Sequence, residues 1–370
     1  MSGAQESPLL GQPKAISALT RAFASSRVHH AWILHGPMGV GKSLAAKVFA
    51  GLVLDPATTP ADVASFAPPT GTEDAALLNA GSHPDFIVIR KELAAVSQSR
   101  ELRDKKQMNI PVDLLRETLI GGVDGEGRML DSAVQRTPAR GRAKVFVIDE
   151  AELLENEAQN VLLKTLEEPP LGTYLFLVTS REDRLLPTIR SRCHRVSFGP
   201  LAPHAMQQWS DQHDWQVDGA ERTWLLQFAE GSPGLALLGS KFGLYQWWQT
   251  LHPQFKQLDQ GNFPPSLAEE MSKCAEEYAE KLIKDNEGAS KDAANRQGVG
   301  MLVRLAGLHL RQRLMNAAAA NDREALDAIQ RAMRTLDTFE EAVRANVNLK
   351  LVMSSLVAAW SQACAPVAIR

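Results

Sequence analysis

The chain has 370 residues, of which 44% are hydrophobic and 22% are charged, and its formal net charge is −3. A chain of this length exceeds one compact core, so we expect two or three globular domains. A net charge so close to zero argues against a protein that coats nucleic acid by bulk electrostatics. The opening segment has no signal-peptide pattern, and no apolar run is long enough for a membrane helix. The composition therefore predicts a cytoplasmic protein without a membrane partner, whose contacts with nucleic acid are local or shared.

The cysteines are few and widely spaced: they are Cys193, Cys274 and Cys364. This spacing gives neither a disulfide framework nor the cluster of thiolates that binds zinc. We expect ordinary buried thiols at these positions.

Short apolar runs alternate with amphipathic patterns in the first part of the chain, as in a parallel sheet flanked by helices. The predicted strands are residues 31–35, 85–90, 144–148, 174–179 and 194–198. Residues 156–168 are predicted to form a helix that ends before Pro169 and Pro170. Residues 55–84 are expected to be a long loop or a partly helical insertion rather than part of the core.

Beyond Pro200 the strand patterns disappear and helical patterns dominate. A continuous apolar stripe at helical spacing is formed by Leu326, Ile329, Met333, Leu336, Phe339 and Val343. Such a stripe belongs either to an internal core or to a helix that forms an oligomer collar, and both interpretations stay open. The composition divides the chain into predicted domains at residues 1–200, 201–250 and 251–370.

The strongest motif runs from Gly36 to Ser43 and has the spacing of a phosphate loop between a predicted strand and a predicted helix. In such a loop the main-chain N–H groups point at phosphate oxygens, and the following helix adds its positive end. The loop residues expected to bind the phosphates in this way are Gly36, Gly39, Val40 and Gly41. Lys42 is expected to contact the β- and γ-phosphates, and the Ser43 hydroxyl to ligate Mg²⁺. The motif predicts a nucleotide site.

Two carboxylates, Asp149 and Glu150, directly follow the predicted strand 144–148. At the carboxyl end of a parallel strand both open into the same crevice as the phosphate loop. Asp149 suits a direct or water-mediated Mg²⁺ contact, and Glu150 suits orientation or deprotonation of an attacking water. The alternative is an acidic cap on the following helix. The long interval between Lys42 and Asp149 favours a multi-strand motor-type ATPase over a small nucleoside kinase.

Three segments carry a resemblance to a known family: NVLLKTLEEPP at 160–170, LVTS at 177–180 and SRC at 191–193. They resemble the bacterial clamp-loader branch of the AAA+ proteins, and the similarity extends from about residue 10 to residue 238. The resemblance implies an α/β fold followed by an all-α part: an AAA+ P-loop domain with a parallel sheet, a small helical lid and a C-terminal helical collar. It further implies ATP with Mg²⁺ and membership of a hetero-pentamer, with gamma/tau and delta subunits, that loads a sliding clamp onto primed DNA.

The resemblance also implies roles for residues outside the phosphate loop. Arg192 is expected to be an arginine finger that reaches the γ-phosphate in a neighbouring subunit, because a guanidinium matches phosphate oxygens and is always charged. Without the flanking motifs, Arg192 reads as a surface residue after a turn. Thr179 or Ser180 stands where the family's first sensor reads the γ-phosphate, although such residues often only cap strand ends.

Two departures from the family pattern are informative. Motor subunits carry an arginine, the second sensor, at the position occupied here by Gly234, and glycine supplies no charge. With Lys42 and Asp149 intact, we therefore expect ATP binding with weak or no turnover. No cysteine lies between residues 51 and 85, so the zinc site of many relatives is not expected.

The leading interpretation is an assembly subunit that braces the ring and donates Arg192. The first alternative is an ATP-hydrolysing motor subunit of gamma/tau type, against which Gly234 argues. The second alternative is a stand-alone AAA+ ATPase that remodels DNA, which leaves the LEEPP and SRC segments unexplained. No carboxylates beyond Asp149 and Glu150 suggest a polymerase centre, so polymerase activity would belong to a larger assembly.

Overall fold

The computed structural model describes residues 7–24, 28–104, 108–285, 289–344 and 348–365. The chain divides into two compact units: unit 1 is Met1–Gln216 with Ala229–Leu235, and unit 2 is Val217–Phe228 with Ala236–Arg370. Among the helices in the described ranges, none combines the length and the apolar character that a membrane span requires.

Unit 1 contains a five-stranded sheet in the order β2-β5-β6-β1-β7, with every pair of neighbours parallel. Its strands are β1 (Ala31–His35), β2 (Phe86–Ile89), β5 (Lys144–Ile148), β6 (Thr173–Thr179) and β7 (His194–Ser197). All five predicted strands are confirmed, and so is the predicted order of an α/β part with a parallel sheet followed by an all-α part. Because β6 lies between β5 and β1, the segments that leave these three strands emerge side by side at the carboxyl edge.

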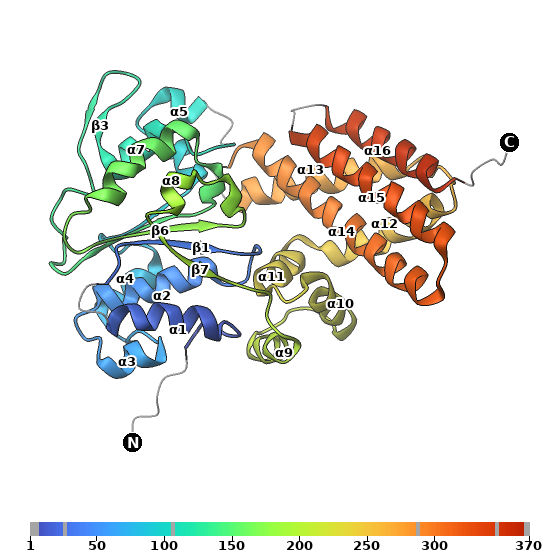
Figure 1. Ribbon diagram of the computed structural model, residues 1–370. Coiled ribbons are helices and arrows are strands. Elements are labelled where there is room, and N and C mark those ends of the chain that lie inside the picture. The colour runs from blue at the N-terminus through green and yellow to red at the C-terminus, as the bar shows by residue number, and fades with distance from the viewer. Residues whose placement is uncertain (1–6, 25–27, 105–107, 286–288, 345–347, 366–370) are drawn as a thin grey trace. The chain divides into compact units, whose positions relative to one another are not determined.

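Helices cover both faces of this sheet (Figure 1). One face carries α1 (Pro13–Ala24), α2 (Lys42–Leu54), α3 (Pro60–Ser65) and α4 (Glu73–Ala80); the other carries α5 (Arg100–Asp104), α6 (Val112–Leu115), α7 (Asn156–Glu167) and α8 (Pro187–Arg190). Side chains alternate between the faces along each strand, as the period of two requires. In β1, Trp32 and Leu34 pack against the α2 side, whereas Ala31 and Ile33 pack against the α7 side.

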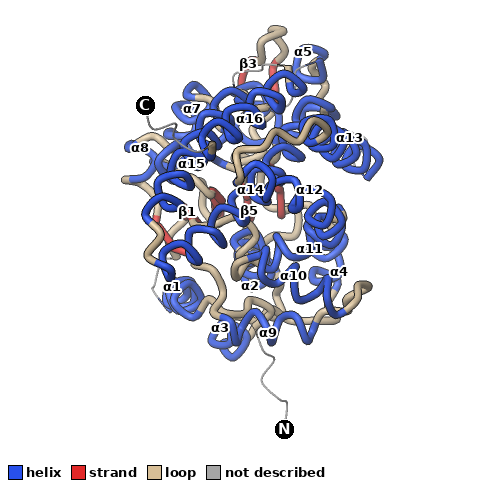
Figure 2. Tube along the Cα trace, turned by 90° about the vertical axis from the view of Figure 1, so that its right-hand side faces the viewer, coloured by secondary structure: helices blue, strands red, loops and turns tan. Residues whose placement is uncertain are grey.

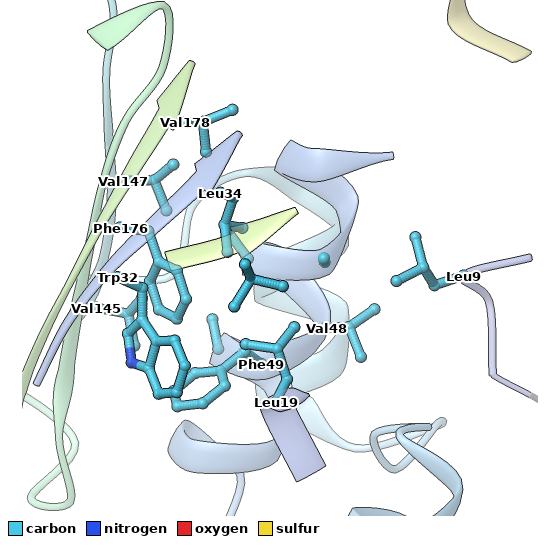
Figure 3. Close-up of a cluster of buried hydrophobic side chains, with 14 of the residues drawn as sticks. Leu9, Leu19, Trp32, Leu34, Val48, Phe49, Val145, Val147, Phe176 and Val178 are labelled. Carbon is cyan, nitrogen blue, oxygen red and sulfur yellow. The ribbon is translucent and has the colours of Figure 1, made fainter. Parts of the chain in front are cut away.

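The core on the α2 side is rich in aromatic rings (Figure 3). Trp32 and Phe176 stack with an interplanar angle of 12°, and Phe49 of α2 meets the Phe176 ring edge-on at 4.9 Å. Each large apolar side chain buried in this way contributes roughly 1.5–3 kcal/mol to stability. This packing fixes α2, and with it the loop that precedes α2, against the sheet.

Residues 55–84 are partly helical, as predicted, because they contain α3 and α4. The prediction that they lie outside the core is wrong, because Phe66 and Leu78 are buried in the core on the α2 side. A threonine caps each of these helices: the Thr59 hydroxyl accepts from the N–H of Asp62, and the Thr72 hydroxyl accepts from that of Ala75. The remaining short elements of unit 1 are η1 (Lys91–Val96), η2 (Arg116–Ile120), β3 (Gly122–Val123), β4 (Met129–Leu130), η3 (Ala151–Leu153), η4 (Glu182–Arg184) and α9 (Pro203–Gln212).

After β7 the described residues form helices and loops alone, blue and tan in Figure 2. The helices beyond α9 are α10 (Gly219–Ala229), α11 (Pro233–Phe242), α12 (Leu244–Asp259), α13 (Leu267–Asp285), α14 (Lys291–Ala320), α15 (Arg323–Arg344) and α16 (Leu349–Cys364). Within unit 2, helices α13 to α16 pack against one another, and α12 continues through residue 251 with Pro253 inside it.

The predicted apolar stripe lies on α15. Ile329, Leu336, Phe339 and Val343 are buried, whereas Met333 is 44% exposed. Most of the stripe therefore belongs to the core of unit 2.

Candidate nucleotide site

The phosphate loop joins β1 to α2 and depends on glycine. Gly36, Gly39 and Gly41 have φ values of +138°, +77° and +102°, a region that side chains disfavour. At Gly36 there is also no room for one, because a Cβ atom would lie 2.1 Å from the carbonyl oxygen of Phe198. The loop is thus held tightly against the segment that follows β7.

Gln12 braces the same loop from the N-terminal side. Its buried side-chain amide donates to the carbonyl oxygens of Val40 (3.2 Å) and Gly199 (2.7 Å). Sequence alone does not identify this role for Gln12, which directly precedes α1. Gln12 acts as a positioning residue for the loop backbone.

Lys42 is the first residue of α2, and only 6% of it is exposed. Its Nζ donates to the carbonyl oxygens of Gly36 (2.7 Å) and Pro37 (2.6 Å). Burial lowers the pKa of Lys42, while the nearby carboxylates of Glu152 and Asp149 act in the opposite sense. A buried ammonium group at the start of a helix, beside a glycine-rich loop, fits a nucleotide phosphate well.

Ser43 and Asp149 lie far apart in the chain but meet at the carboxyl edge. The Ser43 hydroxyl donates to Asp149 Oδ1 at 3.2 Å. A hydroxyl and a carboxylate oxygen in this position are the ligands that Mg²⁺ prefers beside a nucleotide, so the residues present fit an Mg²⁺ ion. Asp149 also forms an ion pair of 3.2 Å with Arg90.

Glu150 forms an ion pair with Lys91, whose side chain is buried, whereas that of Glu150 is 47% exposed. Partial burial raises the pKa of Glu150, and the positive charge of Lys91 counteracts this effect. Glu150 also has a left-handed backbone, with φ at +52°. The carboxylate expected to activate water is therefore already paired within the chain.

Sequence alone does not identify Arg90 and Lys91 as partners of the two carboxylates. The available signal is that both residues come at the end of a predicted strand, because the carboxyl ends of parallel strands share an edge. The pairing of β2 with β5 in the structure brings these residues beside Asp149 and Glu150.

The two candidate sensors lie at the carboxyl end of β6: Thr179 is its last residue, and Ser180 follows it. Thr179 is buried, and its hydroxyl accepts from the N–H of Arg181 at 2.9 Å. The N–H of Ser180 donates to Glu152 Oε1 at 3.2 Å, and the Ser180 hydroxyl donates to the same oxygen. Glu152, two residues beyond Glu150, is thus a third carboxylate at this edge.

The segment around Gly234 touches the phosphate loop. The N–H of Gly234 donates to the carbonyl oxygen of Gly39 at 2.9 Å, and the Ser232 hydroxyl donates to that of Met38 at 2.8 Å. Position 234, where the resemblance leads one to expect an arginine in motor subunits, therefore lies against the loop, but here it offers only a main-chain contact.

Arg192 lies at the other edge of the sheet. Arg192 lies two residues before β7, whose first residue, His194, pairs with Trp32 of β1. It therefore lies at the amino edge of the sheet, whereas the phosphate loop follows the carboxyl end of β1. Its guanidinium is 37% exposed, pairs with Glu167 at 2.6 Å and donates to the carbonyl oxygen of Thr188 at 2.9 Å. The structure thus brings together the loop, Asp149, Glu150 and Ser180, and separates Arg192 from them.

Comparison with known proteins gives one family match and several relatives. The family model described as "DNA polymerase III, delta subunit" matches residues 11–202. A DNA polymerase III subunit delta' of Pseudomonas aeruginosa is 36% identical over 206 residues, which are 55% of this chain and 53% of that protein. A DNA polymerase III subunit gamma/tau of Mycobacterium bovis is 28% identical over 237 residues, which are 61% of this chain and 34% of that protein.

Among solved structures, a DNA polymerase III gamma-subunit-related protein of Thermotoga maritima matches with 19% identity and a TM-score of 0.44, covering 94% of this chain and 99% of that one. The chain spans between a third and about half of the curated relatives named above. The family model, by contrast, covers more than half of the chain. The chain therefore belongs to the family described as DNA polymerase III, delta subunit, a family of clamp-loader subunits.

Proposed function

We propose that this chain is a delta-prime-type subunit of the DNA polymerase III clamp loader, which braces the ring and donates Arg192 to a neighbouring subunit. One observation carries the proposal. Arg192 lies at the amino edge of the sheet, whereas the chain's own phosphate loop lies at the carboxyl edge. A guanidinium so placed reaches a γ-phosphate only in a second subunit.

The contacts of Arg192 support this role. NH2 binds Glu167 and NH1 binds Thr188, which leaves other N–H groups of the guanidinium for a phosphate. Because the group is already oriented by two partners and is partly exposed, less entropy is lost when it contacts the negative charge that develops during phosphoryl transfer.

We further propose that the chain's own site binds ATP with Mg²⁺ through the phosphate loop, Lys42, Ser43 and Asp149. Bound ATP would supply a γ-phosphoryl group to a site whose residues provide N–H donors, an ammonium and a carboxylate. Turnover at this site is proposed to be weak. The reasons are that Glu150 is paired with Lys91 and that Gly234 supplies no charge.

The proposed partners follow from the family. They are gamma/tau and delta subunits in a hetero-pentamer, the sliding clamp, and primed DNA contacted through the complex. Within this proposal, residues 1–200 carry the nucleotide site, residues 201–250 act as the lid and residues 251–370 form the collar. The mutual packing of α13 to α16 supports a helical collar.

The second candidate is a motor subunit of gamma/tau type. Its support is the complete set of Lys42, Ser43, Asp149 and Glu150, with Ser43 and Asp149 in contact. The match to the gamma/tau relative named above covers 61% of this chain, and the match to the delta' relative covers 55%.

The test is reconstitution of the clamp-loader complex with Arg192→Ala, with ATP hydrolysis measured in the presence of clamp and primed DNA. We expect a loss of about tenfold or more, equivalent to at least ~1.4 kcal/mol of transition-state stabilisation. Arg136→Ala is the matched control, because Arg136 is an exposed arginine that pairs with Asp131. An unchanged rate in an intact Arg192→Ala complex overturns the proposal.

A further inference from the structure

Ser180, a candidate reader of the γ-phosphate, gives both of its hydrogen-bond donors to one internal carboxylate. Its main-chain N–H and its hydroxyl both donate to Glu152 Oε1. Hydrogen bonds to an ionised acceptor are about twice as strong as neutral ones. An anion of the chain itself thus occupies the donors that a phosphate oxygen would use.

The sheet order explains why this carboxylate lies in the site. Ser180 follows β6, which is the strand between β5 and β1. It therefore emerges between Asp149 on one side and the phosphate loop on the other. Glu152 belongs to η3, the short turn that directly follows β5 and Glu150, and it reaches across to the end of the next strand.

The second oxygen of the same carboxylate lacks a hydrogen-bond donor in the part of the chain that the structure describes. Glu152 Oε2 is buried and has no hydrogen-bond partner among the described residues. Leaving a buried acceptor unsatisfied is unfavourable, and more so when it carries charge. Burial lowers the pKa of Lys42, and the nearby carboxylate of Glu152 partly opposes this effect. The position of this carboxylate therefore costs folding free energy.

We propose that Glu152 is a specificity-determining residue that disfavours a nucleoside triphosphate relative to a diphosphate, because its carboxylate competes with the γ-phosphate for Ser180. A γ-phosphate adds negative charge beside an existing carboxylate, whereas a diphosphate ends before the sensor. Binding of ATP therefore requires Glu152 to release Ser180. This inference rests on the proposed nucleotide site and is independent of the role of Arg192.

The test compares the affinities of the full chain for Mg²⁺-ATP and Mg²⁺-ADP by calorimetry, in the wild type and in Glu152→Gln. Glutamine keeps the size and an acceptor for Ser180 but removes the charge. We expect the ratio of ATP affinity to ADP affinity to rise about tenfold, because only the triphosphate brings the additional charge close to residue 152. Glu155→Gln is the matched control, an exposed glutamate three positions away that caps α7 by its backbone, and its ratio should equal that of the wild type.

Glu152→Ala is a second variant, in case Glu152→Gln fails to fold. Circular dichroism reports whether each variant is native. Glu152→Ala should shift the ratio of ATP affinity to ADP affinity in the same direction as Glu152→Gln. Binding of both nucleotides with an unchanged ratio in native Glu152 variants overturns the inference and leaves the nucleotide site standing. Binding of neither nucleotide to any of these proteins overturns the nucleotide site, and the inference with it.

Discussion

Gly39 and Gly234 are joined backbone to backbone: the N–H of Gly234 donates to the carbonyl oxygen of Gly39 at 2.9 Å. This contact places the first turn of α11 directly on the phosphate loop. A Cβ atom at Gly234 would lie 2.7 Å from the Cα atom of Gly39. The loop in this conformation thus excludes every side chain at position 234, an arginine included.

Gly234→Ala should therefore displace the phosphate loop. Because the obstructing atom is backbone, we expect a destabilisation of about 1–3 kcal/mol together with weaker ATP binding. Urea unfolding and calorimetric titration with Mg²⁺-ATP measure the two effects. Gly300→Ala is the control, because a Cβ atom at this position of α14 meets open space. This substitution replaces a flexible residue within a helix and should not lower stability. A Gly234→Ala protein as stable as the wild type would contradict the close contact.

Lys91→Met should release Glu150 from its ion pair while keeping a side chain of similar length. The freed carboxylate can then act on water, so basal ATP hydrolysis by the full chain should rise roughly threefold or more at pH 8. Burial raises the pKa of Glu150 and the charge of Lys91 opposes this effect, so the loss of Lys91 should also move the rise of activity to higher pH. A gain that persists in the double variant with Glu150→Gln would show that Glu150 is not its source.

His252 should make unit 2 sensitive to acid. Burial lowers the pKa of His252 to about 4, with further lowering by His309 and Lys256 and an opposing effect of Asp259. The folded state therefore binds fewer protons than the unfolded state between about pH 6.5 and 4, so the free energy of unfolding falls as the pH falls through this window.

The substitution that tests this effect is His252→Phe, which retains an aromatic ring for the stack on Trp248, whose centroid lies 4.1 Å away. The variant should lose about 1–2 kcal/mol less stability than the wild type between pH 7 and pH 4.5. Urea unfolding followed by tryptophan fluorescence provides the measurement. Parallel losses in the two proteins would contradict the assignment to His252.

Much of the fold could be predicted from the sequence because its signals are local. Residues 31–35 and 144–148 are apolar runs that form strands with the same bounds, and Pro169 and Pro170 end α7 within one residue of the predicted end. The phosphate loop can be predicted for the same reason, since its geometry depends on glycines that lie close together in the sequence, at positions 36, 39 and 41.

The partners across the site could not be predicted, because they depend on which strands are neighbours. Lys91 meets Glu150 only because β2 lies beside β5, and Glu152 meets Ser180 only because β6 lies beside β5. The contact of Gly234 with Gly39 likewise joins segments far apart in the chain. A sequence without aligned relatives carries no record of such pairings.

The most direct test of the central claim compares Arg192→Ala with Lys42→Ala in the same reconstituted complex, after gel filtration shows that both complexes are whole. If the chain donates a finger and barely hydrolyses ATP itself, clamp- and DNA-stimulated hydrolysis should fall about tenfold or more for Arg192→Ala and change little for Lys42→Ala. A large loss for Lys42→Ala with an unchanged rate for Arg192→Ala would contradict the account and identify the chain as a motor subunit.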